Sequence, residues 1–324
     1  MTREPIRRIH RSAGRRRKNA LGLAALAVVV VLALALASSR LADQGQPTAH
    51  RLDRLPGSGK VVHLAWPSEG EAAVAVSGLG NLGTSGGGEA VPIASLAKVM
   101  TAYLVLREDP LGPGEEGFTM EVTEADVEDF RRRVDSNQSV LAVEAGEVLS
   151  ERQALEALML PSANNVAVML AVHEAGSVEA FLGEMNEAAA ELGMGGTHYT
   201  DPSGLEDTTV STAADQLKLG RAAMADPTFA EIVAMPSTVL PVVGEVANFN
   251  ELVGHEGFVG IKTGSDDAAG GCLLFARRIE VGGHTRTVLG AVLGQRDGDL
   301  IQAALDSAKA LAESAAAAAR GRKG

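Results

Sequence analysis

Cysteine is almost absent from this chain of 324 residues, which contains only Cys272. A single cysteine excludes an internal disulfide bond and any metal site built from several cysteines. We expect Cys272 to pack as a small apolar side chain. The scarcity of cysteine does not indicate whether the protein resides in an oxidising or a reducing compartment.

Motifs for metal and phosphate chemistry are incomplete. His173-Glu174 lacks the second histidine of a zinc-protease helix, and the other histidines are scattered along the chain. The glycine-rich tract 78–88 lacks the Gly-Lys-Ser order of a phosphate-binding loop, and we expect it to be a simple connecting loop. The sequence therefore predicts no metal ion and no organic cofactor.

Positive charge is scarce outside the N-terminus. The net charge is −12, but residues 1–19 carry eight Arg or Lys and one Glu, which leaves −19 for the rest of the chain. A protein whose remaining residues are this acidic is a poor candidate for nucleic-acid binding. We therefore expect no nucleic acid among its partners.

The basic segment 1–19 leads into residues 20–37, a run of 18 apolar or glycine residues. This length nearly spans a bilayer as a helix, and the basic flank favours the cytoplasmic side. Because Ala35-Leu36-Ala37 also resembles a cleavage site, the run is a transmembrane signal anchor or a signal peptide, and we favour the anchor. We expect a single-pass cell-membrane protein whose folded part lies outside the cytoplasm, or a secreted protein if the segment is cleaved. Residues 38–58 are predicted to form a linker.

The remaining pattern combines helices and strands. Thr123 and Ser150 begin helical stretches with capping signals, and residues 299–319 have the apolar spacing of a helix that packs on a sheet. Segments 61–65 and 72–77, with turn residues between them, predict a hairpin. After Pro227 the chain becomes strand-like and predicts a sheet, with apolar segments at 239–243, 246–249, 259–262, 272–278 and 287–293.

Ser95 and Lys98 stand at the head of an apolar run with helical spacing. Residues i and i+3 of a helix share a face, so the lysine amine can reach the serine hydroxyl. A hydroxyl needs a base to take its proton as it attacks a carbonyl, and a lysine buried beside positive charge can serve because its pKa falls. The same pair, taken alone, also fits a helix N-cap and a solvated lysine.

Two further short motifs follow in the chain. Ser162-Ala163-Asn164 comes after a proline, and Lys262-Thr263-Gly264 ends a predicted strand. Each has a structural alternative, since Ser and Asn cap helices and a strand lysine prevents edge-to-edge aggregation. In the order Ser-x-x-Lys, Ser-x-Asn, Lys-Thr-Gly, the three motifs are the signature set of penicillin-binding proteins and serine β-lactamases.

Over about residues 60–312 the chain resembles the low-molecular-mass serine D-alanyl-D-alanine carboxypeptidases. Beyond the three motifs, the resemblance rests on Met185-Asn186 and on residues 201–205, 211–213 and 269–272. It implies an α/β (α+β) fold of the β-lactamase/DD-peptidase type, with an antiparallel five-stranded sheet flanked by helices and a mainly α-helical lobe. We place this catalytic domain at residues 59–314 and an Ala-rich, basic tail at residues 315–324.

The resemblance also implies the chemistry. Ser95 would attack the penultimate D-alanine of a peptidoglycan stem pentapeptide, with Lys98 as general base and Ser162 as proton relay. The implied substrate-binding residues are Asn164, Lys262, Thr263, Gly264 and Ser265, and the backbone amides of Ser95 and Ser265 would form the oxyanion hole. β-Lactams would acylate Ser95 and inhibit the enzyme.

Some positions depart from the family pattern, and other functions remain open. Asn165 stands where aspartate is common, Ala97 where threonine is common, and Asp266 follows the Lys-Thr-Gly triplet and brings negative charge near the carboxylate pocket. A class A β-lactamase would need a Glu-x-x-x-Asn loop, which is missing from residues 165–261. A non-catalytic penicillin or peptidoglycan sensor, or a transpeptidase or endopeptidase on the same site, is the alternative to a carboxypeptidase.

Overall fold

The computed structural model describes residues 53–54, 61–112 and 114–321. The basic segment 1–19, the apolar run 20–37 and most of the linker 38–58 lie outside the described residues. Within the described residues, no single helix has the length and apolar character needed to cross a membrane. One pair of helices passes that test together, α5 (Asn164–Ala175) and α6 (Val178–Glu191), which are bent by 86° at their junction.

A five-stranded antiparallel sheet forms the centre of the fold, in the order β11-β12-β13-β3-β4. Alternate residues of its strands face two separate apolar clusters, so both faces are covered. Ala73 and Ala75 face the helical lobe, whereas Val74 and Val76 face α9. The sheet strands are β3 (Glu71–Val76), β4 (Gly80–Ser85), β11 (Phe258–Asp266), β12 (Gly270–Val281) and β13 (His284–Gln295).

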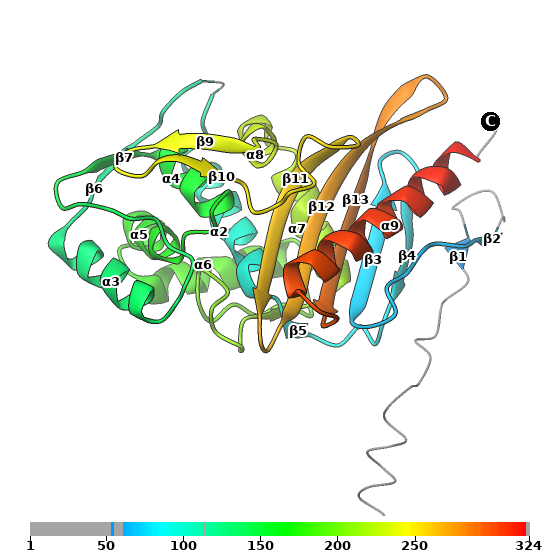
Figure 1. Cartoon of the computed structure of the whole chain (residues 1–324), viewed down its shortest axis with the longest axis horizontal. Coiled ribbons are helices and arrows are strands. Elements are labelled where there is room, and N and C mark those ends of the chain that lie inside the picture. Colours follow the sequence, from blue (N-terminus) through cyan, green and yellow to red (C-terminus); the bar gives the residue numbers. More distant parts are fainter. Residues whose placement is uncertain (1–52, 55–60, 113, 322–324) are drawn as a thin grey trace, which may run out of the picture. The chain divides into compact units, whose positions relative to one another are not determined.

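The helix α9 (Leu300–Arg320) lies across one face of this sheet (Figure 1). It begins at Asp299, whose carboxylate accepts a hydrogen bond from the backbone of Gln302, and it contacts the sheet through fully buried alanines whose small side chains allow a close approach. Ala315 and Ala319 belong to this buried stripe. The domain boundary at residue 314 is therefore corrected: residues 315–320 complete α9 and are not a tail.

The other lobe is mainly helical, as expected (Figure 1). The two predicted capping signals are confirmed, because Thr123 with Asp126 and Ser150 with Gln153 each form a reciprocal capping box. Its helices are α2 (Lys98–Glu108), α3 (Glu124–Asp135), α4 (Glu151–Met159), α5, α6, α7 (Ala213–Ala223) and α8 (Pro227–Val233). Short strand pairs connect them: β5 (Val91–Pro92) with β8 (Val210–Ser211), and β6 (Thr119–Glu121) with β7 (Val148–Ser150).

The glycine-rich tract was predicted wrongly as a loop. It contains β4, which pairs with β3 through a tight turn at Gly78 (φ +72°) and is anchored by the buried Leu82. Gly78, Gly80 and Gly83 match the Gly-x-Gly-x-x-Gly spacing of dinucleotide-binding folds, but they lie in an antiparallel hairpin instead of opening a helix, so the match has no functional context. An edge strand rich in glycine carries little apolar alternation, which explains the error.

Two strand pairings also differ from expectation. The hairpin predicted from segments 61–65 and 72–77 is wrong: β2 (Val61–Val62) pairs with β1 (Asp53–Arg54), and β3 pairs with β4. The segments near 239 and 246 form strands, β9 (Ser237–Leu240) and β10 (Gly244–Ala247), but these make a separate hairpin outside the main sheet. Local pattern identifies a strand without identifying its partner.

Candidate active site

Ser95 lies in the short 3-10 helix η1 (Ala94–Ala97), directly before α2 begins at Lys98. The Lys98 amine donates a hydrogen bond of 2.8 Å to Ser95 Oγ, so the two side chains meet as their spacing predicted. Behind them, the apolar face of α2 is buried in the core. Ala94 has a positive φ of 45°, a backbone conformation that is unfavourable for a residue with a side chain and is common at functional sites.

Lys98 is completely buried, and its amine also donates a hydrogen bond of 2.8 Å to the backbone carbonyl of Ser203. Burial lowers its pKa well below the ordinary value, and the positive charges of Lys262 and Arg133 lower it further, against the opposing effect of Asp201. An amine in this environment gives up its proton more readily than an ordinary lysine, which suits it to act as a base. The geometry therefore places a proton acceptor beside a hydroxyl.

A tight turn at residues 201–205 presents the Ser203 carbonyl to Lys98. The Asp201 carboxylate organises this turn by accepting hydrogen bonds from the backbone and hydroxyl of Ser203, at 3.0 and 2.6 Å, and from the Thr209 hydroxyl at 2.7 Å. Although burial raises the pKa of Asp201, these hydrogen bonds outweigh burial and lower it overall. Gly204 has φ +80°, and a Cβ there would lie 1.7 Å from the Ala94 carbonyl oxygen, so only glycine fits against η1.

Ser162 lies in the turn between α4 and α5, and Asn164 is the first residue of α5; both are buried. Ser162 has φ +65°, and its hydroxyl has no hydrogen-bond partner among the residues that the structure describes. Asn164 donates a hydrogen bond of 3.1 Å to the Gln138 side chain, but its own Oδ1 is also unpaired. Buried polar atoms are normally satisfied, so two unpaired oxygens at the start of α5 point to a site that a ligand completes.

The third motif lies on β11. Lys262 is buried, and burial lowers its pKa to about 7. Thr263 is buried beside it, and a Cβ on Gly264 would lie 2.8 Å from the Ser95 backbone nitrogen. Glycine therefore lets β11 pass directly against η1, which brings the strand to the amide of Ser95 and leaves Ser265 exposed at the cleft.

A cavity of about 420 Å³ opens at this place and contains three of the predicted residues, Ser95, Asn164 and Ser265, in its lining. The other five are not part of this lining, although Lys98 is linked to Ser95 by the hydrogen bond described above. Asp266 also lines the cavity, but its carboxylate accepts a 2.6 Å hydrogen bond from the Ala269 backbone and so closes the turn between β11 and β12. The full lining is Ala94, Ser95, Ser136, Asn137, Gln138, Ser139, Asn164, Gly204, Leu205, Ser265, Asp266 and Asp267.

Sequence reasoning missed the contribution of residues 133–139. Arg133 donates a hydrogen bond of 3.0 Å to Gln138, which in turn receives the bond from Asn164, and the Ser139 carbonyl accepts from the Asn164 backbone at 2.8 Å. The polar run Ser136-Asn137-Gln138-Ser139 directly after α3 is the only local signal for this wall. The Ser203 carbonyl was also missed, since a backbone atom leaves no trace in side-chain motifs.

Metal and thiol chemistry have little support in the described part of the chain. No group of three His, Cys, Asp or Glu side chains lies close enough there to hold a metal ion. Cys272 packs in the core as predicted, and burial raises the pKa of its thiol to about 12. Its sulfur donates a hydrogen bond of 3.7 Å to the Ala269 carbonyl.

Comparison with known proteins identifies the family. Residues 84–294 match the model of the peptidase S11 family, described as D-alanyl-D-alanine carboxypeptidase. The chain belongs to this family. The chain spans less than three fifths of the length of two curated relatives, one named a carboxypeptidase and the other an endopeptidase.

Among the relatives, the chain is 37% identical over 185 residues to the D-alanyl-D-alanine carboxypeptidase DacB2 of Mycobacterium tuberculosis, covering 55% of this chain and 59% of that protein. It is 31% identical over 195 residues to a D-alanyl-D-alanine endopeptidase of Escherichia coli, covering 56% of this chain and 58% of that protein. Among solved structures, a Streptomyces DD-transpeptidase covers 79% of this chain and 97% of its own, with 26% identity and a TM-score of 0.65. The predicted fold class is confirmed by this similarity.

Asn165, the departure beside Asn164, has a structural role. Its side chain accepts a hydrogen bond of 3.0 Å from the Leu141 backbone nitrogen and donates one of 2.9 Å to the Leu141 carbonyl. We expect Asn165→Ala to lower the free energy of unfolding by about 2–4 kcal/mol, because both buried backbone groups lose their partner. Urea unfolding measures this, with Asn81→Ala, which removes one exposed hydrogen bond, as a control that costs less than about 1 kcal/mol. Equal losses in the two variants would contradict the prediction.

The buried lysines predict a stability that rises with pH. The pKa of Lys262 is about 7 in the folded chain against an ordinary value of 10.5, so between these values the unfolded chain binds a proton that the folded chain does not. The free energy of unfolding should therefore rise by about 1.4 kcal/mol per pH unit for this lysine over that window. Below the folded pKa both states are protonated, and the contribution stops changing.

Urea unfolding at pH 7 and pH 9 tests this linkage. The gain in the wild type should exceed the gain in Lys262→Met by about 2–3 kcal/mol. Lys309→Met, which removes an exposed lysine paired with Glu256, serves as the control and should keep the wild-type gain. Identical gains in wild type and Lys262→Met would show that Lys262 is protonated in the folded chain.

Proposed function

We propose that this chain is a serine D-alanyl-D-alanine carboxypeptidase that removes the terminal D-alanine from peptidoglycan stem pentapeptides. The observation that carries the proposal is the 2.8 Å hydrogen bond between the Lys98 amine and Ser95 Oγ, made by a lysine that is wholly buried near a second lysine. This arrangement favours an unprotonated amine next to a nucleophile. Membership of the peptidase family supports the choice of substrate.

The reaction begins when Ser95 Oγ attacks the carbonyl carbon of the penultimate D-alanine. Lys98 takes the hydroxyl proton, and the negative charge that forms on the carbonyl oxygen is stabilised by the backbone amides of Ser95 and Ser265. The bond to the terminal D-alanine nitrogen then breaks, and the proton passes through the Ser162 hydroxyl to that nitrogen. Water next attacks the ester on Ser95, and one of its protons goes to the Ser95 oxygen as the acyl–oxygen bond breaks. The acid so formed loses its proton to solvent, and the shortened peptide leaves as a carboxylate.

Binding of the peptide is shared by the other motif residues. Asn164 directs its unpaired Oδ1 to the peptide amide, and Lys262 and Thr263 bind the terminal carboxylate. Gly264 lets the strand approach the serine closely enough for the substrate to lie between them. A carboxylate beside Lys262 raises the pKa of its amine again, so substrate binding favours the charged lysine.

The same proposal includes the cellular location of the enzyme and its expected inhibitors. The N-terminal segment anchors the chain in the cell membrane, or directs its secretion if cleaved, and places the catalytic domain outside the cytoplasm. β-Lactams act as inhibitors by acylating Ser95, because their strained amide resembles the D-alanyl-D-alanine bond. No nucleic acid is expected, since the chain apart from residues 1–19 has a net charge of −19.

Release of free D-alanine tests the proposal directly. The full chain is incubated with a peptide ending in D-Ala-D-Ala and, as a matched control, with the same peptide ending in D-Ala-L-Ala. Release of D-alanine from the first peptide, with no release of L-alanine from the second, supports the carboxypeptidase. Cleavage only at an internal cross-link would favour an endopeptidase, rapid hydrolysis of penicillin would favour a β-lactamase, and a stable penicillin adduct without turnover would favour a sensor.

A further inference from the structure

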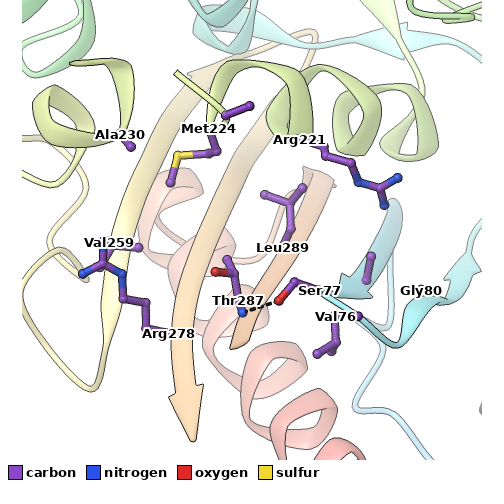
Figure 2. A pocket seen from close by; sticks show the side chains of 13 residues that line it. Val76, Ser77, Gly80, Arg221, Met224, Ala230, Val259, Arg278, Thr287 and Leu289 are labelled. Carbon is purple, nitrogen blue, oxygen red and sulfur yellow. Dashed lines mark hydrogen bonds between the residues drawn. The ribbon is translucent and has the colours of Figure 1, made fainter. Parts of the chain in front are cut away.

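A second cavity, whose lining shares no residue with that of the cavity at Ser95, lies on the face of the sheet that carries α7 (Figure 2). Its volume is about 570 Å³, larger than that of the cavity at Ser95. The interior is apolar: Ala75, Val259 and Leu289 come from the sheet, and Met224 and Ala230 come from the end of α7 and from α8. A pocket of this size and lining is typical of small-molecule sites.

Two arginines flank this apolar interior on opposite sides, Arg221 from α7 and Arg278 from β12 (Figure 2). Neither forms an ion pair with a carboxylate among the described residues, although several other arginines do. No Asp or Glu lines the cavity, in a chain whose residues beyond 19 carry a net charge of −19. Two free guanidinium groups beside an apolar pocket complement an anion that has an apolar body.

The rim of this pocket is held by specific hydrogen bonds. Ser77 and Thr287 are joined twice, through Ser77 N to Thr287 O and Thr287 N to Ser77 Oγ, each at 2.9 Å. Arg286 Nη1 donates to the Ser77 carbonyl at 2.7 Å, and a Cβ on Gly78 would meet that nitrogen at 2.1 Å, so glycine makes room for it. These hydrogen bonds hold the rim in place, which lowers the entropic cost of ordering it when a ligand binds.

We propose that this pocket binds a small organic acid with an apolar body, whose carboxylate is held by Arg221 or Arg278 while the body lies against Leu289, Met224 and Val259. A guanidinium presents paired N–H donors that match the two oxygens of a carboxylate. The apolar walls stabilise a ligand with an apolar body by removing its surface from water, whereas an anion the size of acetate gains little from them. This site is separate from Ser95 and does not depend on the proposed catalytic activity.

Titration of the purified full chain with phenylbutyrate, followed by ligand-observed NMR or calorimetry, tests the proposal. Phenylbutyramide, which has the same shape without the charge, should bind at least about fivefold more weakly, and acetate should not bind measurably. Equal affinity for the acid and the amide would overturn the role of the arginines. Absence of phenylbutyrate binding at millimolar concentration would overturn the site itself.

Variants then locate the binding. Arg221→Gln and Arg278→Gln change exposed side chains and should leave the fold intact, which circular dichroism checks. At least one of these two variants should bind phenylbutyrate about threefold to tenfold more weakly than the wild type, because it lacks the arginine that contacts the carboxylate. The double variant should bind at least as weakly as the weaker single variant. Arg131→Gln, which removes an exposed arginine outside the pocket, should bind like the wild type.

The site at Ser95 must also be excluded as the place of binding. Lys262→Met removes the proposed carboxylate contact of the catalytic cleft and should leave the affinity for phenylbutyrate unchanged. Loss of binding in Lys262→Met together with wild-type affinity in the double arginine variant would overturn the proposal. It would show that the acid occupies the catalytic cleft.

Discussion

Replacing Ser95 with alanine should reduce kcat/KM for D-alanine release by at least about 10³-fold, because among the described residues Ser95 alone of the serines that line the cavity receives a hydrogen bond from the buried Lys98. The hydroxyl is fixed by the 2.8 Å hydrogen bond from Lys98, and it opens onto the cavity between Asn164 and Ser265. The backbone of η1 and the fold should be unchanged, since alanine occupies the same space without the oxygen. The measurement is the rate of free D-alanine release under conditions where substrate is limiting.

A serine elsewhere in the chain provides the control. Ser177 caps α6 by accepting a hydrogen bond from the Ala180 backbone, and it does not line the cavity. Ser177→Ala should cost about 1 kcal/mol of stability and leave the rate of release unchanged. If Ser95→Ala retained wild-type turnover, the assignment of the nucleophile would be wrong.

Lys98→Met should lower the rate of D-alanine release by about 10²- to 10⁴-fold, the range expected when a general base is removed. Methionine has a similar length and suits a fully buried position, so the packing of α2 against the core should persist. Lys98→Arg should be equally inactive, because a guanidinium does not lose its proton in proteins and cannot act as a base. Rates measured from pH 6 to 10 should rise with pH in the wild type and lose this dependence in Lys98→Met.

The direction of that pH dependence follows from the surroundings of the amine. Burial and the positive charges of Lys262 and Arg133 lower the pKa of Lys98, so the basic form is reached well below the ordinary pKa of a lysine. Lys309→Met, at an exposed ion pair, should keep the wild-type rate and profile. Wild-type activity in Lys98→Met would assign the base to another group, and Ser162 would be the first to examine.

The chemistry-bearing side chains could be predicted because each belongs to a short motif. Ser95 and Lys98 meet since their separation matches a helical turn, and Gly264 is explained by the close passage of β11 against η1. The sheet and its covering helix were also predictable, because apolar periodicity in long strands and in α9 is strong. The helix predicted over residues 299–319 matches α9, but the domain boundary was placed at residue 314 because a run of alanines resembles a tail, whereas small side chains serve here for close packing.

Other features could not be predicted, because they depend on contacts between distant segments. The Ser203 carbonyl reaches Lys98 across 105 residues of sequence, and Gln138 meets Asn164 across 26. Neither contact has a periodicity or a spacing that a local pattern could reveal. The pairing of β3 with β4 was missed for a related reason, since its glycines serve the turn and supply few side chains for pattern recognition.

The central claim is that Ser95 is a nucleophile made reactive by Lys98. Intact-mass measurement of the full chain after incubation with benzylpenicillin tests it most directly, followed by mapping of the modified peptide. We expect one penicilloyl adduct, located on the peptide that contains Ser95, formed far more slowly in Lys98→Met and not formed in Ser95→Ala. An adduct that persists in Ser95→Ala, or no adduct in the folded wild type, would contradict the claim.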